Sequence, residues 1–139
     1  MQKIVIDTNV ILSSLIGNSF PKEIIFDFVL NKKVSLCLSE MVFGEYAEVL
    51  HREKFKKYPD FVKNAEILLH KLNDISIYYF PTEKINIVKD EFDNRFLELG
   101  IEAQADYLIT GNTNQFNFKF YKNLQIVTPQ EFVNVYFSI

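Results

Sequence analysis

Near its start the chain reads Lys3-Ile4-Val5-Ile6-Asp7-Thr8-Asn9-Val10-Ile11-Leu12, two apolar runs separated by a short polar segment. The first run contains three β-branched residues, and a continuous apolar run of this kind suits a strand buried on both faces, as in a parallel sheet. Asp7 would then lie at the carboxyl end of that strand, where open α/β sheets bind their ligands. The same residue could instead cap a helix that begins near Val10. Asp7 is therefore a candidate functional residue with a structural alternative.

Length and composition indicate one folded domain. The chain has 139 residues, 48% hydrophobic and 24% charged, and we expect residues 1–139 to form a single domain with an ordinary hydrophobic core. No apolar run approaches the roughly 20 residues that span a bilayer, and the first residues show no signal-peptide pattern. The one cysteine, Cys37, lies in an apolar run and fits a reduced compartment. We therefore expect a cytoplasmic protein without membrane contact.

The charge balance limits the kinds of nucleic-acid binding that are plausible. A net charge of −3 and a pI near 5.4 argue against a protein that holds nucleic acid by bulk electrostatic attraction. They do not exclude an enzyme that meets phosphates through bound cations, because an acidic site attracts cations and the cations then attract phosphate.

Strand-like and helix-like segments alternate along the chain, which is typical of a three-layer α/β domain. We predict a central parallel sheet of about five strands flanked by helices. The expected strands are the segment before Asp7 and residues 34–38, 75–80 and 124–127, and residues 105–111 comprise a further strand and the turn after it. The first three expected helices cover residues 10–16, a segment with Pro21 near its start, and a segment that runs from Ser39 as N-cap to Leu50. A long helix follows from Asp60, and another begins after Asp90. The last covers residues 129–137, because Thr128-Pro129-Gln130-Glu131 has the pattern of a capping box.

Acidic residues at three separate places could meet at one crevice. Besides Asp7, Glu45 borders the apolar stripe of its predicted helix, although a surface Glu at the rim of that helix explains it as well. Asp90 and Glu91 are explained by the attraction of acids to a helix N-terminus, whereas Asp93 lies deeper and is the better candidate for chemistry. Several carboxylates with a polar turn at Asn112 are the oxygen ligands that Mg²⁺ uses. Such a site can hydrolyse a phosphodiester.

The most basic segment is His51-Arg52-Glu53-Lys54-Phe55-Lys56-Lys57-Tyr58. Its aromatic residues could stack on bases while its basic residues touch phosphates, so the candidate RNA contacts are Arg52, Lys54, Lys56 and Lys57. A solvated helix end whose aromatic rings anchor it to the core is the simpler interpretation.

Five blocks of the chain, in order and spacing, resemble the PIN-domain family, in particular the members that are toxins of toxin–antitoxin pairs. The blocks are Val5-Ile6-Asp7-Thr8-Asn9-Val10, Leu38-Ser39-Glu40 followed by Glu45, Asp90 to Leu99, Ala105-Asp106-Tyr107-Leu108-Ile109-Thr110-Gly111, and Ile126-Val127-Thr128-Pro129-Gln130-Glu131-Phe132. The resemblance covers nearly the whole length.

The resemblance implies a Rossmann-like fold and a ribonuclease that depends on Mg²⁺ or Mn²⁺. By resemblance, Asp7, Glu45 and Asp93 are the metal-binding and catalytic acids. Asn9 would orient Asp7, Ser39 and Thr110 would line the site, and a metal-activated water would attack the scissile phosphate. An antitoxin protein would be the native partner, and a homodimer stays open because PIN-like proteins commonly pair.

The sequence departs from the family pattern in one place. After Thr-Gly the family usually has Asp, often with a second Asp two positions on, whereas this chain has Asn112 and Asn114. An amide oxygen can ligate Mg²⁺, but each change removes a full negative charge and should weaken metal binding about tenfold or more. Two hypotheses follow: an active ribonuclease, or a degenerate PIN-fold module that binds RNA or a protein partner.

Overall fold

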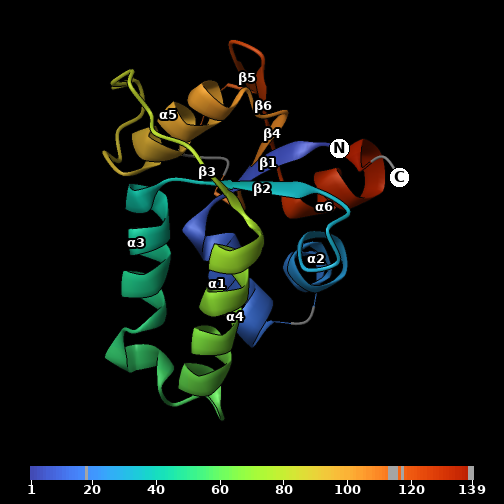
Figure 1. Cartoon of the computed structure of the whole chain (residues 1–139), viewed down its shortest axis with the longest axis vertical. Helices are drawn as coiled ribbons and strands as arrows, with labels where there is room; N and C mark the ends of the chain where they lie inside the picture. Colours follow the sequence, from blue (N-terminus) through green and yellow to red (C-terminus); the bar gives the residue numbers. More distant parts are fainter. Residues whose placement is uncertain (18, 113–115, 117, 138–139) are drawn as a thin grey trace.

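The computed structural model describes residues 1–17, 19–112, 116 and 118–137 (Figure 1). Its elements follow one another in this order: β1 (Lys3–Ile6), α1 (Thr8–Ile16), α2 (Phe20–Lys22), π-helix η1 (Glu23–Val29), β2 (Ser35–Leu38), α3 (Glu40–Leu50), 3₁₀-helix η2 (Glu53–Phe55), α4 (Phe61–Ile75), β3 (Ile77–Tyr78), α5 (Asp93–Ala103), β4 (Tyr107–Ile109), β5 (Phe120–Tyr121), β6 (Leu124–Val127), α6 (Pro129–Glu131) and π-helix η3 (Phe132–Tyr136).

The strands form one six-stranded sheet in the order β3-β2-β1-β4-β6-β5. All neighbouring pairs are parallel except β5 and β6, which are antiparallel. The prediction of a mainly parallel central sheet is therefore confirmed. The sheet has one strand more than the five expected, namely the two-residue β5. It arises because Lys122, in the left-handed region at φ 53°, turns the chain back onto β6. Such a short pairing leaves little periodicity in the sequence to recognise.

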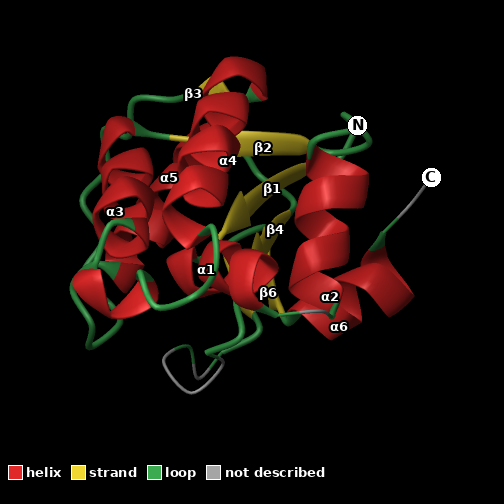
Figure 2. Ribbon diagram, turned by 90° about the horizontal axis from the view of Figure 1, so that it is seen from below, coloured by secondary structure: helices red, strands yellow, loops and turns green. Residues whose placement is uncertain are grey.

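Helices cover both faces of the sheet, so the predicted three-layer arrangement is observed (Figure 1). Helix α5 packs against β1, β2 and β4 on one face, while α1, α2, α4 and α6 lie beyond the other face. Gly100 lets α5 approach β6 closely, because a Cβ atom at this position would lie 2.6 Å from a methyl group of Leu124. Figure 2 shows the layers from below, with the strands enclosed between helices.

The predicted strand at residues 75–80 is wrong in its extent. Helix α4 continues through Ile75, and Ser76 is its C-cap, so that only Ile77 and Tyr78 pair with β2. The apolar stripe of α4 runs to Leu72, and this helical periodicity carries the chain past the expected strand start. The strand does lie at an edge of the sheet.

The local signals at helix termini are confirmed. Ser39 caps α3 by accepting a hydrogen bond from the backbone N–H of Val42 (3.2 Å). Thr128 and Glu131 form the reciprocal capping box at the start of α6, and η3 continues the turn to Tyr136. Cys37 is fully buried in the core, as its apolar neighbours predicted.

Candidate functional site

Asp7 lies where the carboxyl ends of two adjacent parallel strands meet. It follows β1, its N–H donates to the Ile109 carbonyl of β4 (2.9 Å), and its side chain is only 5% exposed. The Thr110 hydroxyl donates to Asp7 Oδ2 (2.6 Å), and the Asn9 backbone N–H donates to Oδ1 (3.3 Å). Asp7 is also the N-cap of α1. The two interpretations of Asp7 therefore coexist, because one carboxylate caps α1 and lies at the carboxyl ends of β1 and β4.

Glu45 reaches the same region because α3 packs against α1. The Thr8 hydroxyl donates to the Glu45 carboxylate, and the buried Tyr46 hydroxyl donates to the Ile6 carbonyl. Two successive residues of α3 thus hold the junction between β1 and α1 from either side of Asp7. Sequence reasoning did not single out Thr8, although its place directly after Asp7 was the available signal.

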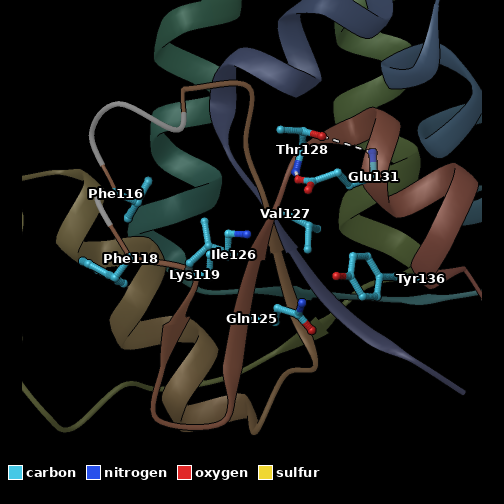
Figure 3. A pocket seen from close by; sticks show the side chains of 9 residues that line it. All are labelled: Phe116, Phe118, Lys119, Gln125, Ile126, Val127, Thr128, Glu131 and Tyr136. Carbon is cyan, nitrogen blue, oxygen red and sulfur yellow. Dashed lines mark hydrogen bonds between the residues drawn. The ribbon is translucent and has the colours of Figure 1, made fainter.

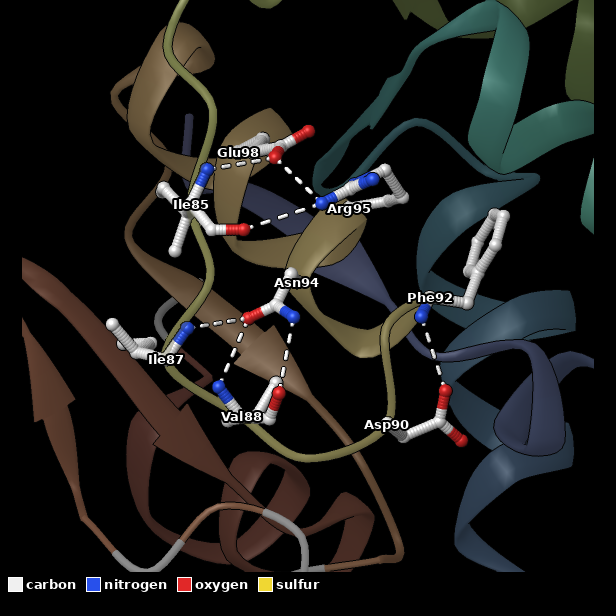
Figure 4. Close-up of polar contacts among 8 residues, drawn as sticks. All are labelled: Ile85, Ile87, Val88, Asp90, Phe92, Asn94, Arg95 and Glu98. Atoms are coloured by element: carbon white, nitrogen blue, oxygen red, sulfur yellow. Dashed lines mark hydrogen bonds and ion pairs between the residues drawn. The ribbon is translucent and has the colours of Figure 1, made fainter.

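Asp93 is the first residue of α5 and is 9% exposed. The segment that leads to it is fixed by polar side chains of the same helix (Figure 4). Asn94 Oδ1 accepts from the N–H groups of Ile87 and Val88 (both 3.0 Å), and its Nδ2 donates to the Val88 carbonyl (3.1 Å). We call this set of contacts the Asn94 clamp. It holds an irregular loop against α5.

A second pair of side chains extends this attachment. Arg95 Nη2 donates to the Ile85 carbonyl (3.2 Å) and lies 2.9 Å from Glu98 Oε2, which in turn accepts from the Ile85 N–H (2.8 Å). Arg95 and Glu98 are both nearly buried. Because its guanidinium is paired with Glu98 and the Ile85 carbonyl, Arg95 does not serve as a counter-charge for Asp93, and its Nε is buried without a hydrogen-bond partner among the described residues. No pattern in the sequence marked these residues.

Burial and neighbouring negative charges raise the pKa values of Asp7, Glu45 and Asp93. Burial, and then the negative charges of Asp7, Asp90 and Glu45, raise the pKa of Asp93 to about 7. Burial also raises the pKa of Asp7, with a further contribution from Asp90, against the hydrogen bonds from Thr110 and from the backbone. The pKa of Glu45 is raised mainly by burial, then by Asp7 and Asp90, while Thr8 and Arg52 oppose the rise. Four acids therefore share one electrostatic environment.

Asp90 is the acid of this group whose position the sequence explained by the attraction of acids to a helix N-terminus. It lies before α5 and is exposed, with its Oδ1 accepting from the Phe92 N–H (3.0 Å). Its charge nevertheless contributes to the raised pKa values of Asp7, Glu45 and Asp93. The loop fixed by the Asn94 clamp brings it there.

The remaining candidates lie at varying distances from the acids. The Asn112 N–H donates to Thr110 Oγ1 (3.0 Å), which places Asn112 one turn beyond the hydroxyl that holds Asp7. Asn9 is exposed and meets Asp7 through its backbone. Ser39 is buried as a helix cap and lines another hollow with Arg95 and Glu98. Asn114 lies outside the described residues.

Of the basic candidates, Arg52 lies nearest to the acids. It lines an open hollow of about 370 Å³ together with Glu45 and Phe92, and it forms an ion pair with Glu48 (3.0 Å). Lys54, Lys56 and Lys57 are exposed on the segment that follows. Phe55 and Tyr58 pack against Phe61 of α4, with ring centroids 5.7 and 6.3 Å apart. These rings anchor the segment, as the simpler interpretation predicted.

The donor chemistry of the crevice fits a hard divalent cation. The carboxylates are poorly solvated, so their negative charges repel one another, and a bound cation would relieve that repulsion. The hydrogen bonds that Asp7 and Glu45 accept from the Thr110 and Thr8 hydroxyls come from neutral donors. Within the described part of the chain, no three His, Cys, Asp or Glu side chains form a ready-made ligand cluster. The acids would have to draw together around a cation.

The sheet and its acidic edge define a Rossmann-like α/β domain with a carboxylate-rich crevice at the ends of its parallel strands. The chain belongs to the PIN-domain family, whose model, described as PIN domain, matches residues 3–114. A protein of Methanocaldococcus jannaschii named "Uncharacterized protein MJ1680" is 29% identical over 140 residues, covering 94% of this chain and 89% of that protein.

The fold also has a similar solved structure. A chain in the crystal structure of VapBC2 from Rickettsia felis, bound to a DNA fragment from their promoter, superposes with a TM-score of 0.54 and 18% identity, covering 91% of this chain and 98% of that chain. At this level of identity the similarity concerns the fold. In the described residues, no helix is long and apolar enough to cross a membrane.

Proposed function

We propose that this PIN-domain protein is a metal-dependent endoribonuclease of the kind that acts as the toxin of a toxin–antitoxin pair, with residues 1–139 as one domain. The observation that carries the proposal is the gathering of Asp7, Glu45, Asp90 and Asp93 in one electrostatic environment, with the pKa of Asp93 raised to about 7. Keeping mutually repelling acids together costs stability, and a functional site is the usual reason for such a cost. Family membership makes nuclease chemistry the first candidate.

Asp7, Glu45 and Asp93 would hold Mg²⁺ or Mn²⁺, with the Asn112 amide oxygen as a further ligand. A bound divalent cation supplies activation of water and stabilisation of the charge that develops at phosphorus. The chain contributes the orientation of the acids: the Thr110 hydroxyl fixes Asp7, the Thr8 hydroxyl fixes Glu45, and the Asn94 clamp fixes the start of α5. Because these donors are neutral, they orient the carboxylates without cancelling their charge.

The RNA backbone would enter past Arg52, whose guanidinium lines the same hollow as Glu45. Lys54, Lys56 and Lys57 would extend the positive surface along the strand. The acidic overall charge suits a protein that meets RNA at one site rather than over its whole surface. Such a substrate would be met in the cytoplasm.

The partner would be a cognate antitoxin protein. The similarity to toxins of this family and the fold that the chain shares with a chain of VapBC2 both support this part of the proposal. A homodimer is compatible with the same assembly.

The decisive experiment compares the parent protein with Asp7→Asn on a long single-stranded RNA in Mn²⁺ and in EDTA. We expect Mn²⁺-dependent cleavage by the parent and none by Asp7→Asn, with far-UV circular dichroism and the melting temperature showing that the variant is folded. Asn can still cap α1, so the fold should survive. Equal cleavage by both proteins would overturn the assignment of the site.

A catalytically degenerate module that binds RNA or a protein is the second candidate. Two observations favour it: Asn112 in place of the usual acid, and the lack of a ready-made cluster of metal ligands among the described residues. Restoring the charge with Asn112→Asp separates the candidates. If the parent is inactive and Asn112→Asp cleaves RNA, the module is a nuclease scaffold that has lost one ligand.

A further inference from the structure

A hollow of about 450 Å³ lies at the β5–β6 edge of the sheet (Figure 3). Its lining combines aromatic rings from Phe116, Phe118 and Tyr136 with polar groups from Lys119, Gln125 and Thr128. The volume lies in the range of small-molecule sites, which are typically about 300–1,000 Å³. Neither the site assignment nor the comparisons account for this hollow.

The sheet register ties this hollow to Asp7. Ile6 pairs with Ile109, and Ile109 pairs with Val127, so the next residues on the three strands, Asp7, Thr110 and Thr128, lie in one row along the carboxyl edge. The Thr110 N–H donates to the Val127 carbonyl (2.9 Å), which fixes the row. Because neighbouring strands are about 4.8 Å apart, Thr128 lies about 10 Å from Asp7. Gln125 pairs with Tyr107 and lies three residues before Thr128, about 10 Å further along the strand. An extended RNA strand of a few nucleotides can span the distance from Asp7 to Gln125.

Two polar groups of the hollow are available to a ligand, whereas the Thr128 hydroxyl accepts from the Glu131 N–H (3.1 Å). The side-chain amide of Gln125 and the ammonium of Lys119 have no hydrogen-bond or ion-pair partner among the described residues, and Gln125 is half-buried. The aromatic wall is held in place, since Phe116 packs edge-on against Phe118 with centroids 6.1 Å apart and Tyr136 packs on Tyr107 at 5.3 Å. Flat, rigid walls with an unsatisfied amide suit a planar, hydrogen-bonding ligand.

The charges indicate which part of a nucleotide enters. Glu131 also lines the hollow, where its Oε1 accepts from the Thr128 N–H (2.9 Å), and its negative charge disfavours a phosphate inside. A carboxylate and an amide instead accept hydrogen bonds from the amino group of a base. Lys119 is exposed, so it can meet a phosphate outside the hollow.

We propose that the hollow lined by Phe118, Gln125 and Tyr136 is a base-binding subsite for an unpaired RNA nucleotide a few positions from the scissile phosphate, selective for bases that carry an exocyclic amino group. The proposal rests on the proposed ribonuclease function and deepens it, because it gives the reaction a determinant of sequence preference. A base held there would set which phosphodiester lies at the acids.

The test measures RNA binding without cleavage. Fluorescein-labelled pentanucleotides of A, C and U are titrated with the full chain in EDTA and followed by fluorescence anisotropy. The parent should bind A and C more tightly than U. Gln125→Leu, which keeps the size of the side chain but removes the amide, should reduce this preference about fivefold or more. Lys119→Met should weaken binding of all three RNAs alike. The control Lys63→Met, at an exposed position of α4, should leave the affinity for each RNA unchanged.

Several outcomes would overturn the subsite: a parent without base preference, a Gln125→Leu variant with the parent's preference, or an equal loss on all three RNAs. If Gln125→Leu misfolds, Gln125→Glu takes its place and should favour amino-bearing bases further. Because the assay contains no metal, a parent that shows the preference but never cleaves RNA in Mn²⁺ retains the subsite and loses the nuclease assignment. A parent that cleaves RNA in Mn²⁺ but shows no base preference retains the nuclease assignment and loses the subsite.

Discussion

The hydroxyl of Thr110 donates a 2.6 Å hydrogen bond to Asp7 Oδ2 across 103 positions of sequence. The contact joins the ends of β1 and β4 and fixes one oxygen of a carboxylate that is almost completely buried. Because Thr110 is itself fully buried, no water can replace it without rearrangement. This hydrogen bond is the geometric centre of the candidate site.

Replacing Thr110 with Val should therefore affect both stability and metal binding. The shape is kept while the donor is lost, so Asp7 Oδ2 becomes a buried acceptor without a partner, at a cost of about 1–3 kcal/mol in the free energy of unfolding. Urea denaturation measures the loss, and Mn²⁺ titration by electron paramagnetic resonance measures the weaker metal binding. Thr110→Ser keeps the hydroxyl and should stay close to the parent. A Thr110→Val protein with unchanged stability would contradict this role.

Neutralising Asp93 should stabilise the metal-free protein while removing activity. Asp93→Asn relieves the repulsion from Asp7, Asp90 and Glu45 that raises the pKa of Asp93. We expect a higher melting temperature in EDTA, by about 2–6 °C for each kcal/mol gained in a domain of this size. Asp27→Asn, at an exposed position of η1, is the matched control and should not shift it. A lower melting temperature for Asp93→Asn would show that the acid is structural.

The stability of the metal-free protein should fall as the pH rises from about 4 to 7. The pKa of Asp93 is 3.8 in the unfolded chain and about 7 in the folded chain, so the folded state binds more protons across this interval. The free energy of unfolding then decreases with increasing pH and levels off above the folded pKa. The raised pKa values of Asp7 and Glu45 act in the same direction.

Urea midpoints at pH 5 and pH 8 in EDTA test this dependence. The midpoint should be higher at pH 5, and millimolar Mn²⁺ should reverse the order, because the cation binds the ionised carboxylates of the folded state. Asp93→Asn should show a flatter profile. A parent midpoint that rises with pH in EDTA would refute the coupling among the acids.

Asn94→Ala should release the loop before α5. The substitution removes the three hydrogen bonds of the Asn94 clamp and leaves the buried N–H of Val88 and the partly buried N–H of Ile87 without their acceptor. We expect faster tryptic cleavage after the exposed Lys84 and Lys89, together with a loss of about 2–4 kcal/mol in stability. Asn134→Ala, at an exposed position, serves as the control. Identical digestion patterns would show that the loop is fixed by other contacts.

The Cys37 thiol should be unreactive until the protein unfolds. Burial raises its pKa to about 11, so at pH 8 only about one thiol in a thousand is ionised even before access is considered. Reaction with a thiol reagent should be slow in the native state and should accelerate along the urea unfolding curve. Rapid stoichiometric labelling without urea would contradict the burial of Cys37.

The sequence determined the features that depend on near neighbours. The apolar run before Asp7 marked a buried parallel strand, the Ser39 and Thr128 caps marked helix starts, and Cys37 marked a core position, because each signal lies within a few residues of the structure that it specifies. The family blocks extended this reach to the fold as a whole. The strand at residues 75–80 was misjudged where helical and strand periodicity compete over a short apolar stretch.

Only the tertiary structure decided which polar groups meet. Thr110 holds Asp7 across 103 positions and Thr8 holds Glu45 across 37. The Asn94 clamp fixes the loop that contains Asp90, and Asp90 in turn affects Asp7, Glu45 and Asp93. Helix spacing and sheet register set such contacts, and both depend on packing over the whole domain. The same register places Thr128 in line with Asp7, and it places Gln125 of the hollow three residues toward the amino end of β6, level with Tyr107 and Ile4. Sequence supplied the chemistry of the site, and packing of the sheet and helices supplied its geometry.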